Sequence, residues 1–186
     1  MGKIILASSS PRRADILKQH NVKYRVIPSP YQEDHSVTDF SYSFVESLAY
    51  NKALAVVPLV DVPSKIIGAD TVVVLDDKIL GKPKDYQDAF GMLKNLSGRK
   101  HQVVTSIAVI DTATKSEKVV SVTSIVEFAE LSDEQIKFYI DNYKPFDKAG
   151  AYGIQEMPEG YIKGFEGSFD NIVGLCAKTA LELLEE

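Results

Sequence analysis

The 186-residue sequence is short of features on which several large classes of protein depend. Cys176 is its single cysteine, so no disulfide can form within the chain and no cysteine-based zinc site exists. No apolar run approaches the roughly 20 residues needed to cross a membrane. The short apolar run near the N-terminus, with one lysine before it, does not have the pattern of a signal peptide. We therefore expect a cytoplasmic protein with no membrane partner.

The sequence also lacks an excess of basic residues and the common nucleotide-binding motifs. The formal net charge is −5, whereas a nucleic-acid-binding protein needs a basic face. The chain contains neither G-x-x-x-x-G-K-[ST] nor G-x-G-x-x-G, and His20, His35 and His101 are scattered without metal-ligand spacing. We expect no nucleic-acid partner, although a local basic cleft in an acidic protein can still attract a small polyanion.

The pattern of the chain predicts one α/β domain over residues 1–186. Hydrophobic residues make up 45% and charged residues 25%, as in ordinary globular proteins, and no repeat or linker divides the sequence. Alternating strands and helices, followed by two long paired strands, predict a mixed sheet flanked by helices. The expected strands are 4–6, 24–28, 65–75, 78–80, 102–111 and 119–129, and the expected helices begin near 11, 41, 85 and 132, with a last one ending at 181–184.

The most informative stretch is residues 4–13, where a short strand runs into three serines, a proline and two arginines. Ser10 fits the N-cap of a helix and Pro11 fits its first position. Arg12 and Arg13 then occupy a helix start that disfavours cations by roughly 0.3–1 kcal/mol. Backbone N–H groups, hydroxyls and two guanidinium groups suit a phosphate chain. Two solvated arginines on a surface helix are the alternative.

An aspartate interrupts the apolar run at residues 66–74. A buried carboxylate without a partner is costly, so we expect Asp70 to be hydrogen-bonded, paired with a cation or bound to a metal. Gly68 and Ala69 lack bulk and let another group approach the backbone closely. Asp70 could instead cap a neighbouring element or pair with a core arginine.

Four further residues are candidates for the same site, each with an ordinary alternative. Lys52 shares the inward-facing stripe of the second predicted helix, although a lysine there can also extend to solvent. Lys82 lies in a constrained Gly-Lys-Pro loop, and Glu33 could add a carboxylate to a Mg²⁺ site. Gln155 ends a segment of small residues and offers both a donor and an acceptor for reading a base edge.

Five segments, taken in order, closely resemble the Maf family of septum-formation-inhibitor-like nucleoside triphosphate pyrophosphatases. They are LASSSPRR at 6–13, GADTVV at 68–73, GKP at 81–83, LSGR at 96–99 and DKAGAYGIQ at 147–155. The chain departs from the family pattern at Cys176, where proline is common, and in detail across residues 165–171. The resemblance implies an elongated, two-lobed α/β domain with a central cleft, shared in outline with inosine triphosphate pyrophosphatases and often found as a homodimer.

The resemblance also implies hydrolysis of a nucleoside triphosphate to the monophosphate and pyrophosphate, with a divalent cation such as Mg²⁺ or Mn²⁺. Asp70 matches the position of the proton acceptor. Three residues match positions that set specificity in the dTTP/UTP-preferring branch: Arg12, Thr71 and Gln155. Five match positions around the phosphates and the metal: Ser8, Arg13, Glu33, Lys52 and Lys82. Removal of modified pyrimidine nucleotides rests on the resemblance alone.

We expect the triphosphate to lie across the start of the first helix, with Mg²⁺ held by Asp70 and Glu33, and water to attack the α-phosphorus. Asp70 acts as the base or orients a metal-bound water, and the sequence leaves both roles open. Thr71 and Gln155 are expected to hydrogen-bond the pyrimidine edge. Two other functions stay open: a non-catalytic nucleotide-binding regulator of cell division, and a sugar-phosphate enzyme that would leave Asp70 and the lysines unexplained.

Overall fold

A single mixed sheet runs through the computed structural model, which describes residues 3–34 and 36–185 and so leaves His35 outside it. Seven strands of the described residues form this sheet, in the order β2-β1-β3-β5-β6-β7 with β4 paired to β3. The strands are β1 (Lys3–Leu6), β2 (Tyr24–Val26), β3 (Ser64–Leu75), β4 (Lys78–Leu80), β5 (Lys100–Asp111), β6 (Ser116–Phe128) and β7 (Ile162–Glu166). The pairs β1–β2 and β1–β3 are parallel and the other pairs are antiparallel.

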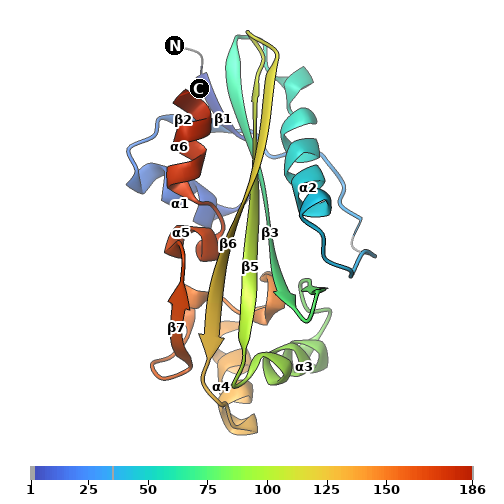
Figure 1. Cartoon of the computed structure of the whole chain (residues 1–186), viewed down its shortest axis with the longest axis vertical. Coiled ribbons are helices and arrows are strands. Elements are labelled where there is room, and N and C mark those ends of the chain that lie inside the picture. Colours follow the sequence, from blue (N-terminus) through green and yellow to red (C-terminus); the bar gives the residue numbers. More distant parts are fainter. Residues whose placement is uncertain (1–2, 35, 186) are drawn as a thin grey trace.

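The molecule is elongated because β3, β5 and β6 run along most of its length (Figure 1). The helices are distributed along the length of the sheet (Figure 1). They are α1 (Pro11–Gln19), α2 (Tyr42–Leu54), α3 (Tyr86–Leu96), α4 (Asp133–Tyr143), α5 (Phe169–Val173) and α6 (Ala177–Glu185), with short 3-10 turns η1 (Val57–Leu59), η2 (Ala149–Ala151) and η3 (Ile154–Glu156). The predicted α/β fold with a mixed sheet is confirmed.

Alternation along β3 assigns each neighbouring helix to one face of the sheet. Ile66 packs with α2, whereas Ile67 and Ala69 pack with α1 and α6. Successive side chains of a strand point to opposite faces, so Asp70 lies on the α2 face and Thr71 on the α1 face. Two consecutive predicted site residues are therefore directed to different sides of the sheet.

The edge of β3 is open in the middle of the molecule. On this edge, β1 pairs with residues 64–67 and β4 with residues 73–75, and within the described chain residues 68–72 have no strand partner on that side. The chain leaves the carboxyl end of β1 here and turns into α1. In open α/β sheets, ligands bind in the crevice outside the carboxyl ends of the strands, and the carboxyl end of β1 lies at this open edge.

Residues 147–173 hold more regular structure than the sequence indicated. They contain η2, η3, the edge strand β7 and the short helix α5, none of which was predicted. Gly164 and the charged residues of β7 hide the alternation expected of a strand, and α5 is too short to show helical periodicity. Within the described part of the chain, every helix is too short or too polar to cross a membrane.

Candidate active site

The start of α1 has the capping geometry expected from the sequence, with Ser10 at the N-cap and Pro11 at the first helical position. The Ser10 side chain makes no capping hydrogen bond; its backbone N–H instead donates to Ser8 Oγ at 3.1 Å. No acidic residue lies in the first turn, so Arg12 and Arg13 add positive charge to the positive end of the helix dipole. The structure thus presents a helix start suited to an anion.

Arg13 holds three parts of the protein together. Its Nε donates to the Gly174 carbonyl at 2.9 Å, and its Nη1 and Nη2 donate to Ser8 Oγ and Thr71 Oγ1, each at 3.2 Å. Burial lowers the pKa of the guanidinium, while the nearby negative charges of Asp70 and Glu33 raise it. Arg13 therefore fixes the serine turn against β3 and lies within electrostatic range of the carboxylates.

Thr71 lies beneath Arg13, on the α1 face of the sheet. Its Oγ1 is 2.9 Å from Thr105 Oγ1 and donates to the Gly174 carbonyl at 3.2 Å. The Thr71 hydroxyl is therefore hydrogen-bonded within the protein. Gln155 lines a pocket beside α1, and Thr71 is not among the residues that line this pocket. That Thr71 and Gln155 read one base edge together stays a prediction.

Three charged residues meet on the α2 face of the sheet, and we call them the charged centre: Glu33, Lys52 and Asp70. Lys52 Nζ donates to Asp70 Oδ1 at 2.5 Å and lies 2.8 Å from Glu33 Oε1. Lys52 and Asp70 are buried, with 9% and 6% of their surface exposed. A buried carboxylate without a partner would be strongly destabilising. The partner expected for Asp70 is Lys52.

Gly68 explains how α2 brings Lys52 to Asp70. A Cβ at Gly68 would lie 2.2 Å from the Ala49 carbonyl oxygen and 2.7 Å from the Ala53 backbone nitrogen. The helix backbone is in direct contact with β3 at this point. Only glycine allows so close an approach, which agrees with the reason for its presence inferred from the sequence.

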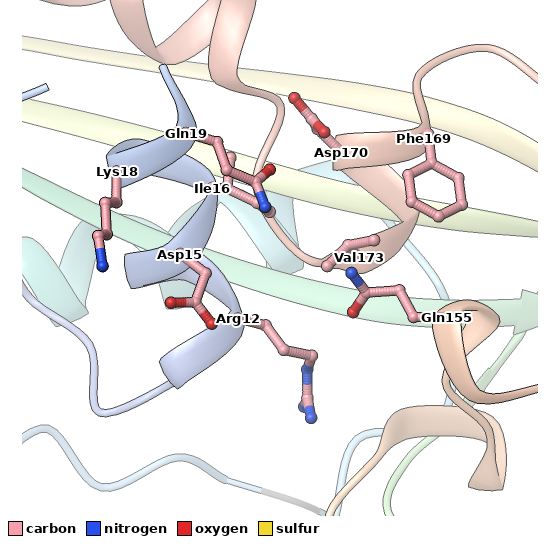
Figure 2. A pocket seen from close by; sticks show the side chains of 9 residues that line it. All are labelled: Arg12, Asp15, Ile16, Lys18, Gln19, Gln155, Phe169, Asp170 and Val173. Atoms are coloured by element: carbon pink, nitrogen blue, oxygen red, sulfur yellow. The ribbon is translucent and has the colours of Figure 1, made fainter. Parts of the chain in front are cut away.

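A second feature, which we call the side pocket, opens between α1, η3 and α5. It has a volume of about 540 Å³, and Arg12 and Gln155 both line it. Figure 2 shows Gln155 and Phe169 on one side of the pocket, facing the side chains of α1. The full lining is Arg12, Asp15, Ile16, Lys18, Gln19, Gln155, Phe169, Asp170 and Val173.

Arg12, which lines the side pocket, belongs to an ion-pair network that was not predicted from the sequence. Arg12 Nη1 donates to Asp147 Oδ2 at 3.2 Å, and Asp147 Oδ1 accepts from Lys148 Nζ at 2.9 Å. Lys148 is buried and also pairs with Glu156 at 3.1 Å. The small-residue segment indicated a close approach to a ligand, but nothing in it distinguished Lys148 from a solvated lysine.

Lys82 stands apart from the other predicted site residues. It is exposed on the loop between β4 and α3, and no hydrogen bond or ion pair joins it to another residue of the described chain. The loop itself is tied down, since the Gly81 carbonyl accepts from the Gly150 N–H at 3.0 Å. The nine predicted residues thus fall into two groups joined by contacts, Ser8–Arg13–Thr71 and Glu33–Lys52–Asp70, and a pair that lines one pocket, Arg12 and Gln155, with Lys82 alone.

The charged centre has the donors that a divalent cation prefers. The Glu33 and Asp70 carboxylates converge on one cationic group, the Lys52 ammonium, and hard oxygen ligands are those that Mg²⁺ takes. No set of three or more His, Cys, Asp or Glu side chains in the described residues is arranged to hold a metal. Two carboxylates fit Mg²⁺ where substrate phosphates and water complete its coordination.

The open edge of β3, the cationic start of α1 and the buried Asp70 beside the half-buried Glu33 are together the features expected of an α/β protein that binds phosphate groups. A HAM1 protein from Coxiella burnetii shares the fold, with a TM-score of 0.51 at 14% identity over 100% of both chains.

The family model described as "Maf-like protein" matches residues 3–186, and the chain belongs to this family. A dTTP/UTP pyrophosphatase of Ruminiclostridium cellulolyticum is 44% identical over 100% of this chain and 96% of the relative. Another, from Thermosipho africanus, is 44% identical over 98% of this chain and 92% of the relative.

Proposed function

We propose that this protein hydrolyses dTTP and UTP to the nucleoside monophosphate and pyrophosphate. The full-length relatives that carry this activity in their names support the substrate pair. The observation that carries the proposal is the charged centre, in which Asp70 is buried against Lys52 within electrostatic range of Arg13. Catalysis at phosphorus depends mainly on positioning and on stabilising charge, and these residues supply both.

Binding of the triphosphate begins at α1 in this proposal. Arg12 is 32% exposed at its side chain, so its guanidinium can exchange Asp147 for a phosphate oxygen. Lys82 is exposed and free to turn toward the same anion. Lys52 would contribute its charge from the α2 side while it holds the Asp70 carboxylate in place by a hydrogen bond.

A divalent cation is part of the proposal. Glu33 and Asp70 would hold it, together with phosphate oxygens, because two carboxylates do not complete the coordination of Mg²⁺. When bound, the cation would neutralise phosphate charge and lower the pKa of a coordinated water. Since Lys52 pairs with both carboxylates in the protein alone, we expect the cation to bind tightly only with the nucleotide.

The chemical step follows from the position of Asp70. A water oxygen bonds to the α-phosphorus, and the bond between that phosphorus and the oxygen bridging to the β-phosphate breaks. Pyrophosphate leaves, and Asp70 accepts the proton of the attacking water and passes it to solvent. A carboxylate fixed on a central strand is well placed for general-base work because its own backbone does not need to move.

The experiment is a pyrophosphate-release assay, coupled to inorganic pyrophosphatase, over dTTP, UTP, CTP, ATP and GTP with and without Mg²⁺ or Mn²⁺. We expect turnover of dTTP and UTP that requires the metal. Turnover led by a guanine nucleotide would contradict the specificity. Tight binding of dTTP without pyrophosphate release would instead establish a nucleotide-binding regulator.

A further inference from the structure

Phe169 is an exposed aromatic residue at the entrance to α5, and no role was predicted for it. Its surface is 41% exposed, and it lines the side pocket together with Gln155. An exposed ring is common on protein surfaces. Phe169 differs from such surface rings because it lies in the same pocket as the Gln155 amide. The volume of this pocket, about 540 Å³, is typical of a small-molecule site.

The backbone that carries Phe169 is firmly held against the sheet. Ser168 N–H donates to Ser124 Oγ at 3.0 Å, and Ser124 Oγ donates back to the Ser168 carbonyl at 3.1 Å. The fully buried Asn171 donates from Nδ2 to the Val103 carbonyl at 3.0 Å. Gly167, with φ of 99°, allows the tight turn before the helix.

This rigidity has a consequence for binding. A ligand that covers Phe169 does not have to order the backbone beneath it, and ordering costs are a major penalty in association. The exposed surface of the ring is therefore available for contact with little loss of conformational entropy. Phe165 on β7 packs against the ring from outside the pocket, with ring centroids 5.6 Å apart.

The charge around the side pocket favours a neutral ligand group over a phosphate. With Arg12 assigned to the phosphates, the charges left in the lining are Lys18 against Asp15 and Asp170, whereas the first turn of α1 holds cations and no acid. Phosphates are thus favoured at the helix start, and the uncharged end of a nucleotide is favoured in the pocket. Ile16 and Val173 add apolar surface to the lining.

We propose that Phe169 stacks on the pyrimidine base of the substrate while the Gln155 amide hydrogen-bonds the edge of that base. The inference rests on the proposed function, since it assigns the base end of the same nucleotide. Uracil and thymine present a donor between two acceptors, and the Gln155 amide offers one acceptor and two donors. Base–aromatic stacking changes the affinity for a base by about 5- to 100-fold.

The test compares Phe169→Leu with Phe169→Tyr and with the control Phe165→Leu, which removes the neighbouring ring outside the pocket. Binding of dTMP is measured by calorimetry, and KM and kcat for dTTP by pyrophosphate release. Phe169→Leu should raise the Kd of dTMP and the KM for dTTP by about 5- to 100-fold, with kcat within a few-fold. Phe169→Tyr and Phe165→Leu should stay close to the unaltered protein.

Inhibition by inorganic tripolyphosphate separates stacking from a structural role. Its Ki should be the same in Phe169→Leu and in the unaltered protein, because this inhibitor has no base. An unchanged Kd and KM in Phe169→Leu, or an equal rise in the tripolyphosphate Ki, would overturn the inference. If the unaltered protein fails to hydrolyse dTTP, the proposed function fails, but dTMP binding still tests Phe169; absence of dTMP binding by the unaltered protein would overturn the inference as well.

Discussion

The charged centre and the side pocket are built in opposite ways. In the charged centre, Lys52 and Asp70 are buried on the α2 face and satisfy one another at 2.5 Å. In the side pocket, Gln155 and Phe169 are exposed beside balanced surface charges on the α1 face. Charge acts most strongly where water is excluded, whereas a neutral base is recognised by open apolar surface and a few hydrogen bonds.

The charged centre is nevertheless linked to the α1 face of the sheet, on which the side pocket lies. Asp70 and Thr71 are neighbours on β3 that face opposite sides of the sheet, and Arg13 donates to Thr71 while its pKa responds to Asp70. A nucleotide passing the open edge of β3 would contact both faces. We infer that the edge of the sheet, rather than either face, sets where the triphosphate lies.

The largest expected effect comes from Asp70→Asn, which keeps the shape of the side chain and removes its charge. Loss of the base and of one cation ligand should lower kcat for dTTP by about 10³-fold or more. Pyrophosphate release measures it, and thermal unfolding checks that the variant folds. Asp147→Asn, which removes a carboxylate beside the side pocket, is the control and should keep kcat within a few-fold. Near-normal turnover of dTTP by Asp70→Asn would contradict the assignment of the chemical step to the charged centre.

Gly68→Ala tests whether the charged centre depends on close contact between α2 and β3. The added methyl group would overlap the Ala49 carbonyl oxygen, so α2 must move and carry Lys52 away from Asp70. We expect a loss of about 1–3 kcal/mol in the free energy of unfolding together with lower kcat. Urea unfolding measures the first quantity.

Gly91→Ala is the matched control for Gly68→Ala. Gly91 lies inside α3, and a Cβ there would meet nothing within 4 Å. This change should leave activity unchanged and stabilise the protein by about 0.5–1 kcal/mol, because alanine favours a helix more than glycine does. Equal behaviour of the two variants would show that the contact at Gly68 does not position Lys52.

Gln155→Leu should act on recognition rather than on chemistry. Loss of the amide leaves polar atoms of a pyrimidine unpaired, so kcat/KM for dTTP and UTP should fall by about 10-fold, mostly through KM. The KM for CTP and GTP should change less. A fall in kcat at constant KM would place Gln155 with the charged centre instead.

Asp147→Asn should have the smallest effect, this time on KM. The Arg12–Asp147 pair is exposed, and the buried Lys148, which loses Asp147 as an ionic partner, keeps Glu156 at 3.1 Å. The change should therefore lower the free energy of unfolding by about 1–2 kcal/mol at most. Because Arg12 no longer has a competing carboxylate, the KM for dTTP should fall by about 2- to 3-fold. A higher KM would show that Asp147 positions Arg12 for the substrate.

The sequence predicted the charged centre better than the side pocket, for a physical reason. An aspartate inside an apolar strand and a lysine on an inward helix stripe both break a local pattern, so each predicts a buried partner. Phe169 and Lys148 break none. Phe169 begins the short helix α5, which is held by the contact of Ser168 with Ser124. Lys148 lies just before η2 and pairs with Glu156 of η3. These elements are too short to show a periodic pattern in the sequence.

Hydrolysis of dTTP in water enriched in ¹⁸O, followed by mass spectrometry of both products, tests the central claim most directly. Attack on the α-phosphorus predicts one ¹⁸O in dTMP for each turnover and none in pyrophosphate, when the coupling enzyme is left out. Label in the pyrophosphate, or formation of dTDP and orthophosphate, would show that water attacks another phosphorus. Either result would contradict the reaction assigned to Asp70.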